Sequence, residues 1–298
     1  MTDQNIQLLA IEAFLRRASE VDYPFMLKGS ILTRQYLDDP KMRYVRDLDW
    51  MYMDRLYSVE EAGDLFSNWV TEVMEVKKND RVKFLSFREN DFWREINYAM
   101  SDDFPTVNTD LSCFVGDIKN DDLGLDISFN HLFGEEAVPL MYQPLEGEPF
   151  LIPYTSPLPI QISGKLHQTI TRPRLKDIYD LILLLKHPDF DKSVLKKTLR
   201  ALRKECRADK VPIGRLKWFC SDLVYYYFLK KENPDSKKVD FRRFKSQCIF
   251  LKNFIYLNGF GIYDVRYFMP KELNPYSTLS ELMLAFKNAL NDAGFGSL

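Results

Sequence analysis

The sequence predicts a mixed α/β fold of the α+β class, in which a mixed-sheet domain (residues 1–155) precedes a mostly helical domain (residues 156–298). Short apolar runs typical of strands alternate with helical patterns in the first part, whereas the second part shows helical patterns only. A proline-rich passage, residues 139–159, separates the two parts. A chain of 298 residues also has the length of two ordinary domains.

The first domain is expected to begin with a helix, because apolar residues recur at helical spacing over residues 6–15. The sequence Asp22-Tyr23-Pro24 ends this helix, and Phe25 to Leu27 form a short buried strand. That strand runs directly into Gly29-Ser30 and a second helical stretch through Tyr36. Gly29 and Ser30 are therefore predicted to lie where a helix begins.

Further strands follow a polar loop. Residues 47–53 (DLDWMYM) read as a strand, and Ser58 with Glu61 forms a capping box for a helix that runs to about Val76. Several β-rich runs lie within residues 82–115, and Leu123 to Phe129 (LGLDISF) add another strand bounded by charged turns. The helices expected in the second domain lie at about 157–170, 174–187, 190–206, 213–231 and 239–258, with a weaker pattern at 278–291.

The composition is that of a globular protein with a sizeable core, since 46% of residues are hydrophobic and 14% aromatic. No apolar run reaches about 18 residues, and the N-terminus has acidic and polar residues where a signal peptide has basic ones. A cytoplasmic protein is expected. The cysteines and histidines are scattered, which favours buried thiols over a zinc site or a Cys/His nucleophile: Cys113, Cys206, Cys220, Cys248, His131, His167 and His187.

The net charge of −2 conceals an uneven distribution. Residues 165–253 contain 23 Lys and Arg against 10 Asp and Glu, a net of +13, while the remainder contains 18 against 33, a net of −15. A basic segment of this kind is typical of a protein that binds a polyanion such as RNA. The same pattern also arises when basic helices have solvated faces and no such partner.

Asp47 and Asp49 are the first candidates for chemistry. Because side chains alternate along a strand, these two carboxylates lie on one face, where they could bind divalent cations that act on phosphates. An isolated pair of this kind also occurs at solvated strand edges and turns.

The neighbouring motifs strengthen the first interpretation. Upstream, the free N–H groups of a helix that begins at Gly29-Ser30 could bind phosphate oxygens. Downstream, Asp126 stands among apolar residues in a predicted strand, where a buried carboxylate is costly unless it is paired or binds metal. The alternative places Asp126 on the outward face of an edge strand.

Taken together, these motifs resemble the DNA polymerase β-like nucleotidyltransferase superfamily, and more narrowly the bacterial abortive-infection toxin family AbiEii. The resemblance is carried by FMLKGSILTRQY, RYVRDLDW, Lys165 in SGKLHQTI, and TRPRLKDIYDLILLL, which span residues 25–185. It implies a polymerase β-like nucleotidyltransferase domain followed by a helical domain that closes the nucleotide cleft.

The resemblance also implies residue roles. Two Mg²⁺ ions would be held by the carboxylates of the second and later strands, and the NTP by the remaining motif residues. The implied metal ligands are Asp47, Asp49 and Asp126, the implied catalytic residues are these three with Asp177, and the implied nucleotide-binding residues are Lys28, Gly29, Ser30, Arg46, Lys165, Arg172 and Arg174. The family often has a second glycine where Ser30 stands, and residues 38–45 lengthen the usual linker.

The spacing of the last motifs leaves two arrangements open. Lys165 and Arg172 are seven residues apart and would share a face of one continuous helix, although Pro173 favours two helices. Asp177 could orient an arginine or take part in catalysis, while Asp180 could simply cap a helix or form an ion pair.

The implied activity is transfer of a nucleotidyl group from an NTP to an acceptor hydroxyl, with an RNA or tRNA 3′ end as acceptor and a separate antitoxin protein as partner. Three alternatives stay open. One is the same chemistry on a protein hydroxyl or small molecule, which the basic segment disfavours, and another is a non-catalytic RNA-binding module, which the three aspartates disfavour. The third is a structural or interaction protein in which the motifs occur by chance.

Overall fold

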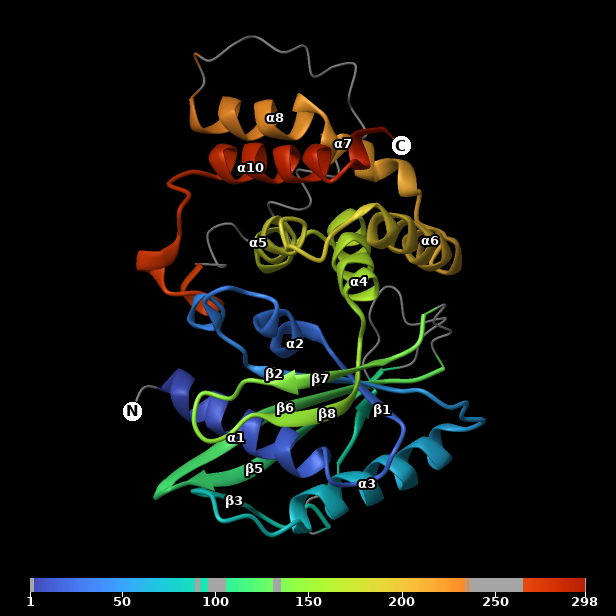
Figure 1. Cartoon of the computed structure of the whole chain (residues 1–298), viewed down its shortest axis with the longest axis vertical. Helices are drawn as coiled ribbons and strands as arrows, with labels where there is room; N and C mark the ends of the chain where they lie inside the picture. Colours follow the sequence, from blue (N-terminus) through green and yellow to red (C-terminus); the bar gives the residue numbers. More distant parts are fainter. Residues whose placement is uncertain are drawn as a thin grey trace. The chain divides into compact units, whose positions relative to one another are not determined.

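The computed structural model describes residues 3–88, 92–95, 106–130, 135–233, 235 and 265–297. The chain divides into two compact units: the first comprises Met1–Gln35 and Tyr44–Pro157, and the second comprises Tyr36–Arg43 and Leu158–Leu298 (Figure 1). The short segment Tyr36–Arg43 thus leaves the first unit and packs in the second. No helix in the described part of the chain is long and apolar enough to cross a membrane.

The first unit is built on one mixed sheet with strand order β3-β5-β6-β2-β1-β8-β7, in which β4 also pairs with β5. Its strands are β1 (Phe25–Lys28), β2 (Asp47–Tyr52), β3 (Val82–Phe84), β4 (Arg94–Glu95), β5 (Thr106–Val115), β6 (Ile118–Ser128), β7 (Val138–Tyr142) and β8 (Phe150–Thr155). Its helices are α1 (Asp3–Ala18), α2 (Gly29–Gln35) and α3 (Val59–Glu75). β2 pairs in parallel with β6 and antiparallel with β1.

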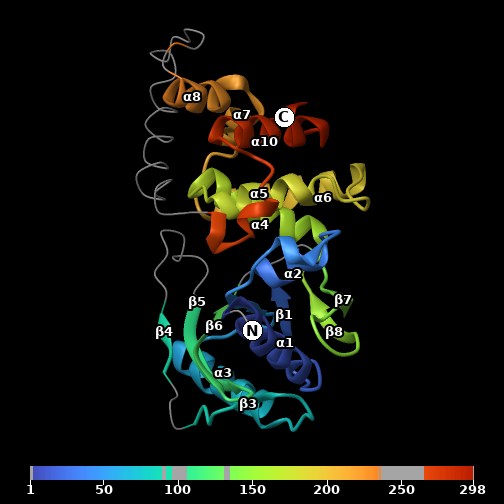
Figure 2. The same cartoon turned by 90° about the vertical axis from the view of Figure 1, so that its left-hand side faces the viewer.

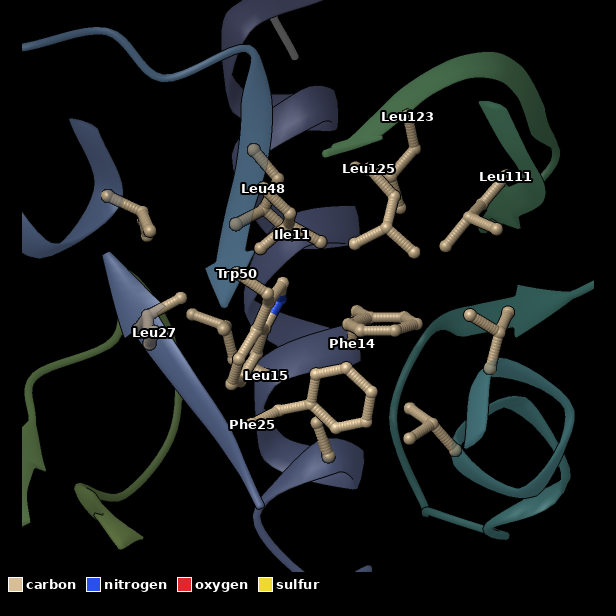
Figure 3. Close-up of a cluster of buried hydrophobic side chains, with 14 of the residues drawn as sticks. Ile11, Phe14, Leu15, Phe25, Leu27, Leu48, Trp50, Leu111, Leu123 and Leu125 are labelled. Carbon is tan, nitrogen blue, oxygen red and sulfur yellow. The ribbon is translucent and has the colours of Figure 1, made fainter. Parts of the chain in front are cut away.

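One face of this sheet carries the core of the first unit. Leu48 and Trp50 of β2 and Leu125 of β6 point toward helix α1, which contributes Ile11, Phe14 and Leu15 (Figure 3). Helix α3 adds Trp69, whose ring stacks on Phe25 at 3.9 Å between centroids. Because side chains alternate, the residues between these apolar positions lie on the opposite face of the sheet.

The start of α3 follows the predicted cap with one change. The Ser58 hydroxyl accepts the Glu61 N–H at 3.0 Å as expected, but the Glu61 carboxylate accepts the N–H of Tyr57 rather than that of Ser58. The strand predicted at Leu123 to Phe129 is longer than expected, since β6 already begins at Ile118 and includes the charged residues assigned to a turn. Antiparallel pairing with β5 gives Lys119 and Asn120 partners, Phe114 and Cys113, that the local sequence does not reveal.

The second unit is helical. Its elements are η1 (Pro40–Met42), α4 (Leu158–Thr171), α5 (Leu175–Leu184), α6 (Lys192–Ala208), η2 (Ile213–Arg215), α7 (Leu216–Cys220), α8 (Asp222–Glu232), η4 (Val265–Tyr267), η5 (Lys271–Leu273), α10 (Leu279–Asp292) and η6 (Phe295–Ser297). Helices α8 and α10 run side by side in both views (Figures 1 and 2).

The single helix predicted over 213–231 is wrong. Ser221 is extended and its hydroxyl accepts the Leu223 N–H at 3.3 Å, so that it caps α8 and ends α7. Serine competes with the helical backbone in this way because its side chain can replace a backbone acceptor. The helix predicted over 239–258 lies outside the described residues, as do Cys248 and His131.

Candidate active site

The three aspartates predicted from the sequence lie on one face of the sheet in the first unit. Asp49 of β2 is the register partner of Asp126 of β6, and Asp47 is the partner of Gly124. Partners on adjacent parallel strands point to the same face, and Asp47 shares that face because it is two residues from Asp49. Asp126 therefore does not point to the opposite face from Asp49.

The electrostatics of Asp126 reflect this crowding. Burial raises the pKa of its carboxyl to about 6, and the neighbouring charges of Asp49 and Asp47 act in the same direction. Asn108 of β5 and Lys28 at the end of β1 lower the pKa of Asp126, which limits the rise. The Asn108 amide donates to Asp126 Oδ1. Among the described residues, no three His, Cys, Asp or Glu side chains converge closely enough to form a metal-binding group.

Gly29 lies directly against Asp49. It has a φ of +78°, which L residues with a side chain rarely adopt, and a Cβ atom at this position would lie 1.9 Å from Asp49 Oδ2. Ser30 follows, and its hydroxyl donates to Asp47 Oδ1 at 3.3 Å. The Gly29-Ser30 pair thus touches both carboxylates of β2, a contact that any larger residue at position 29 would prevent.

The remaining first-unit candidates are less enclosed. Lys28 is the register partner of Asp49 across the β1–β2 pair. Arg46 immediately precedes β2 with an exposed side chain, and its carbonyl oxygen accepts from the Gln7 amide at 2.6 Å.

The second unit contains a buried ionic cluster that we call the Lys165 cluster: Arg43, Lys165, Arg174, Asp177 and Asp180. The Lys165 ammonium of α4 donates to Asp180 Oδ2 at 2.6 Å and lies 3.6 Å from Asp177 Oδ1. Arg174 Nε donates to Asp177 Oδ2 at 2.5 Å. Lys165 is only 8% exposed, and a lysine is seldom buried to this extent unless carboxylates pair with it.

Both carboxylates of the cluster are held ionised. Burial raises the pKa of Asp177 and of Asp180, but the neighbouring cations outweigh burial and leave each pKa below its usual range. For Asp177 the main cations are Arg174 and Lys165, and for Asp180 they are Arg43 and Lys165. Asp177 thus pairs with Arg174, and Asp180 forms buried ion pairs with Arg43 and Lys165.

Arg172 does not share the helix of Lys165. Helix α4 ends at Thr171, and Arg172 lies in the exposed connection to α5. Arg174 occupies the N-cap position of α5. Pro173 between them accounts for the break, since proline removes a backbone donor and restricts the residue before it.

Two residues near these groups were missed by reasoning from the sequence. Asn108 could have been placed on the polar face by strand alternation, but its bond to Asp126 depends on the β5–β6 register. Arg43 donates from Nε to Asp180 Oδ1 at 2.9 Å across 137 residues of chain, and no local pattern signals such a contact.

Comparison with known proteins decides the family. A family model described as "Nucleotidyl transferase AbiEii toxin, Type IV TA system" matches residues 13–253. The chain belongs to the AbiEii family. It is accordingly a nucleotidyltransferase, and the AbiEii description places such enzymes among the toxins of type IV toxin–antitoxin systems. The AbiEii assignment implies an NTP substrate and an antitoxin partner.

One solved structure agrees with this AbiEii assignment at the level of the fold. A protein from H. pylori assigned as a nucleotidyltransferase is 16% identical, with a TM-score of 0.50 over 98% of this chain and 96% of that one. MenT4, a nucleotidyltransferase toxin from Mycobacterium tuberculosis H37Rv, is 12% identical, with a TM-score of 0.48 over 99% and 93%. No curated protein sequence matches. The predicted α+β, polymerase β-like fold is thus confirmed.

Proposed function

We propose that this AbiEii enzyme transfers a nucleotidyl group from an NTP to a hydroxyl of RNA, with a tRNA 3′ end as the favoured acceptor, and that it requires Mg²⁺. The observation that carries the proposal is the register pairing of Asp49 with Asp126 on the face that also bears Asp47.

We assign the three carboxylates to a pair of divalent cations. Their mutual repulsion contributes to the raised pKa of Asp126, and bound cations would relieve that repulsion. Asp47 and Asp49 would hold both ions, and Asp126 one of them. Two Mg²⁺ ions bound here would supply charge stabilisation at the attacking and the leaving oxygens of the phosphoryl transfer.

The remaining candidates are assigned to the triphosphate. Gly29 leaves room for close approach beside Asp49, and Ser30 and Lys28 offer a hydroxyl and a cation next to the carboxylates. In the second unit, Lys165 is proposed to bind phosphate oxygens, with Arg172 and Arg174 as further cations and Asp177 holding Arg174 in place. Asp126 would accept the proton of the acceptor hydroxyl as the new phosphodiester bond forms and pyrophosphate leaves.

The choice of RNA as acceptor rests on helix α6. Its outward positions are basic over four turns, whereas its buried positions are Thr198, Leu202, Glu205 and Cys206. The exposed basic residues of α6 are Lys192, Lys196, Lys197, Arg200, Arg203, Lys204 and Arg207. A surface of this kind binds a phosphate backbone without reading its sequence.

A labelling experiment tests the proposal. Each α-³²P-labelled NTP is incubated with the protein, Mg²⁺ and total RNA, and the products are separated before and after ribonuclease treatment. We expect label in RNA of tRNA size, lost with EDTA and with Asp49→Ala. The matched control is Asp122→Asn, an exposed carboxylate four residues before Asp126 on the same strand, which should label normally.

Other results would change the acceptor or reject the activity. Label that resists ribonuclease and migrates with protein would identify a protein hydroxyl as acceptor. Equal labelling by wild type and Asp49→Ala would contradict the proposed role of the three aspartates.

A further inference from the structure

The Lys165 cluster includes Arg43, a residue of the segment RYVRDLDW to which the motifs assign no role. The Asp180 carboxylate lies between two cations: Oδ2 accepts from Lys165 Nζ at 2.6 Å, and Arg43 donates from Nε to Oδ1 at 2.9 Å and from Nη2 to Oδ2 at 3.3 Å. Asp180 is 1% exposed and Arg43 is 6% exposed. Arg43 reaches this position because Tyr36–Arg43 packs in the second unit.

The surroundings of the Arg43–Asp180 pair are apolar. A cavity of about 30 Å³ adjoins it, with walls that include Leu37, Met42 and Met269. The Arg43 guanidinium also lies over the Phe268 ring, 5.8 Å from its centroid. Water competes poorly in such a setting, so the bidentate pair fixes both side chains, and removal of either partner leaves a buried charge uncompensated.

Arg43 also changes the charge balance at Lys165. With Arg43 the cluster contains three cations and two carboxylates: Arg43, Lys165 and Arg174 against Asp177 and Asp180. Without Arg43 the cluster would contain two cations and two carboxylates, and within it Asp180 would pair with Lys165 alone. An ammonium whose charge is balanced by its own carboxylate attracts an anion less strongly than an ammonium whose carboxylate is shared with a second cation.

We infer that Arg43 is a positioning residue for nucleotide binding: by holding Asp180, it keeps the Lys165 ammonium in a fixed direction with charge available for a triphosphate. This inference rests on the proposed function, in which Lys165 binds phosphate oxygens. Arg43 itself is not assigned a contact with the nucleotide.

The test measures affinity rather than turnover. Equilibrium dialysis with Mg²⁺ and an NTP analogue whose α,β-bridging atom is carbon gives a Kd that does not depend on transfer. Arg43→Ala should raise this Kd on the order of tenfold, the effect of weakening about one charge-assisted hydrogen bond. Arg43→Lys, which retains the charge but not the bidentate geometry, should give an intermediate Kd.

A double-mutant cycle links the effect to Lys165. Lys165→Ala alone should raise the Kd, and adding Arg43→Ala should raise it little further, because both substitutions remove the same interaction. The matched control is Arg17→Ala. Arg17 is also a buried arginine in a bidentate pair, with Asp80 in the first unit at 2.7 and 3.0 Å, so its loss should lower Tm and leave the Kd unchanged.

Chemical rescue supplies a readout that a purely structural role would not change. Millimolar methylguanidinium should lower the Kd of Arg43→Ala, because the cation can occupy the space left beside Asp180, and should not affect Lys165→Ala. A folded Arg43→Ala protein with wild-type Kd, or additive effects in the cycle, would overturn the inference while the role of Lys165 stands. A wild-type Kd for Lys165→Ala would overturn that role and the inference together.

Discussion

Gly29 packs against Asp49 so closely that a Cβ atom at position 29 would lie 1.9 Å from the carboxylate oxygen Oδ2. Gly29→Ala must therefore displace the Asp49 carboxylate and also strain a backbone with φ +78°. We expect a loss of transfer rate on the order of 10²-fold, since a displacement of about 1 Å at a catalytic group has that effect. Initial rates of NTP incorporation measure it.

Gly116 provides the control for this substitution. It also has a positive φ, +61°, but a Cβ atom there would meet nothing within 4 Å. Gly29→Ala and Gly116→Ala should both lose about 1–2 kcal/mol of stability through backbone strain, and Gly116→Ala should keep its activity. Equal rates for the two variants would show that the Gly29–Asp49 contact does not matter for transfer.

Asp126→Asn is predicted to stabilise the protein in the absence of divalent cations. The pKa of Asp126 is raised to about 6 in the folded state, so the folded state holds this proton more tightly than the unfolded state, whose pKa is near 3.8. The stabilising contribution of the proton is complete below pH 3.8 and is lost as pH rises through about 6. The Tm difference between variant and wild type should therefore grow between these values and then level off.

Mg²⁺ should reverse the order of stability of Asp126→Asn and the wild type. One of the two proposed cations needs the ionised Asp126 carboxylate, so Mg²⁺ should raise the Tm of the wild type above pH 6 by more than it raises the Tm of Asp126→Asn, which retains Asp47 and Asp49. Thermal denaturation with EDTA or with Mg²⁺ compares the two directly. A similar Mg²⁺-induced rise in both proteins would place the cation away from Asp126.

Glu205 in helix α6 predicts a second pH dependence. It is buried, and burial raises its pKa to about 8. Asp209 acts in the same direction, while the Ser163 hydroxyl, which donates to Glu205 at 3.2 Å, lowers the pKa. The proton on Glu205 stabilises the folded protein fully below pH 4.5, the pKa of this group in the unfolded state. This stabilisation is lost as the pH rises through about 8. Glu205→Gln, which mimics the protonated form, should become progressively more stable than wild type over that range.

Urea denaturation at several pH values measures this difference. Glu205→Ala is the contrasting variant, because the cavity it creates should destabilise the protein at every pH. A pH-independent difference between Glu205→Gln and wild type would mean that Glu205 is ionised in the folded protein at neutral pH.

Helix α6 is predicted to govern RNA affinity. Arg203→Glu and Lys204→Glu reverse charges on its exposed face, and each should weaken RNA binding and flatten the dependence of log Kd on log salt by about 0.7–0.9 for each phosphate that is no longer neutralised. NTP affinity should be unchanged. Lys83→Glu, an exposed lysine on β3 of the first unit, is the control. Filter binding at several salt concentrations measures the slopes, and slopes that do not change would exclude this face as the RNA site.

The sequence predicts features that depend on local patterns. The shared face of Asp47 and Asp49 follows from alternation along a strand, which is local, and the cap at Ser58 follows from residue chemistry.

Contacts between distant segments could not be predicted in this way. The bond between Asn108 and Asp126 requires a particular β5–β6 register, and the pairing of Arg43 with Asp180 requires a segment between two strands of the first unit to pack in the second. The polar residues 119–122 resemble a turn by composition, yet strand pairing places them in β6. Tertiary context overrides local preference at these positions.

The packing of Tyr36–Arg43 in the second unit affects how this protein can be divided into fragments. A fragment ending at Pro157 would carry Leu37 without the apolar neighbours that cover it, and a fragment beginning at Leu158 would contain Asp180 without Arg43. Neither piece could simply be expressed alone or exchanged for its counterpart in a relative, because the complementary piece holds the counterion or the covering surface it needs. Modular recombination at the apparent boundary would have to transplant these eight residues as well.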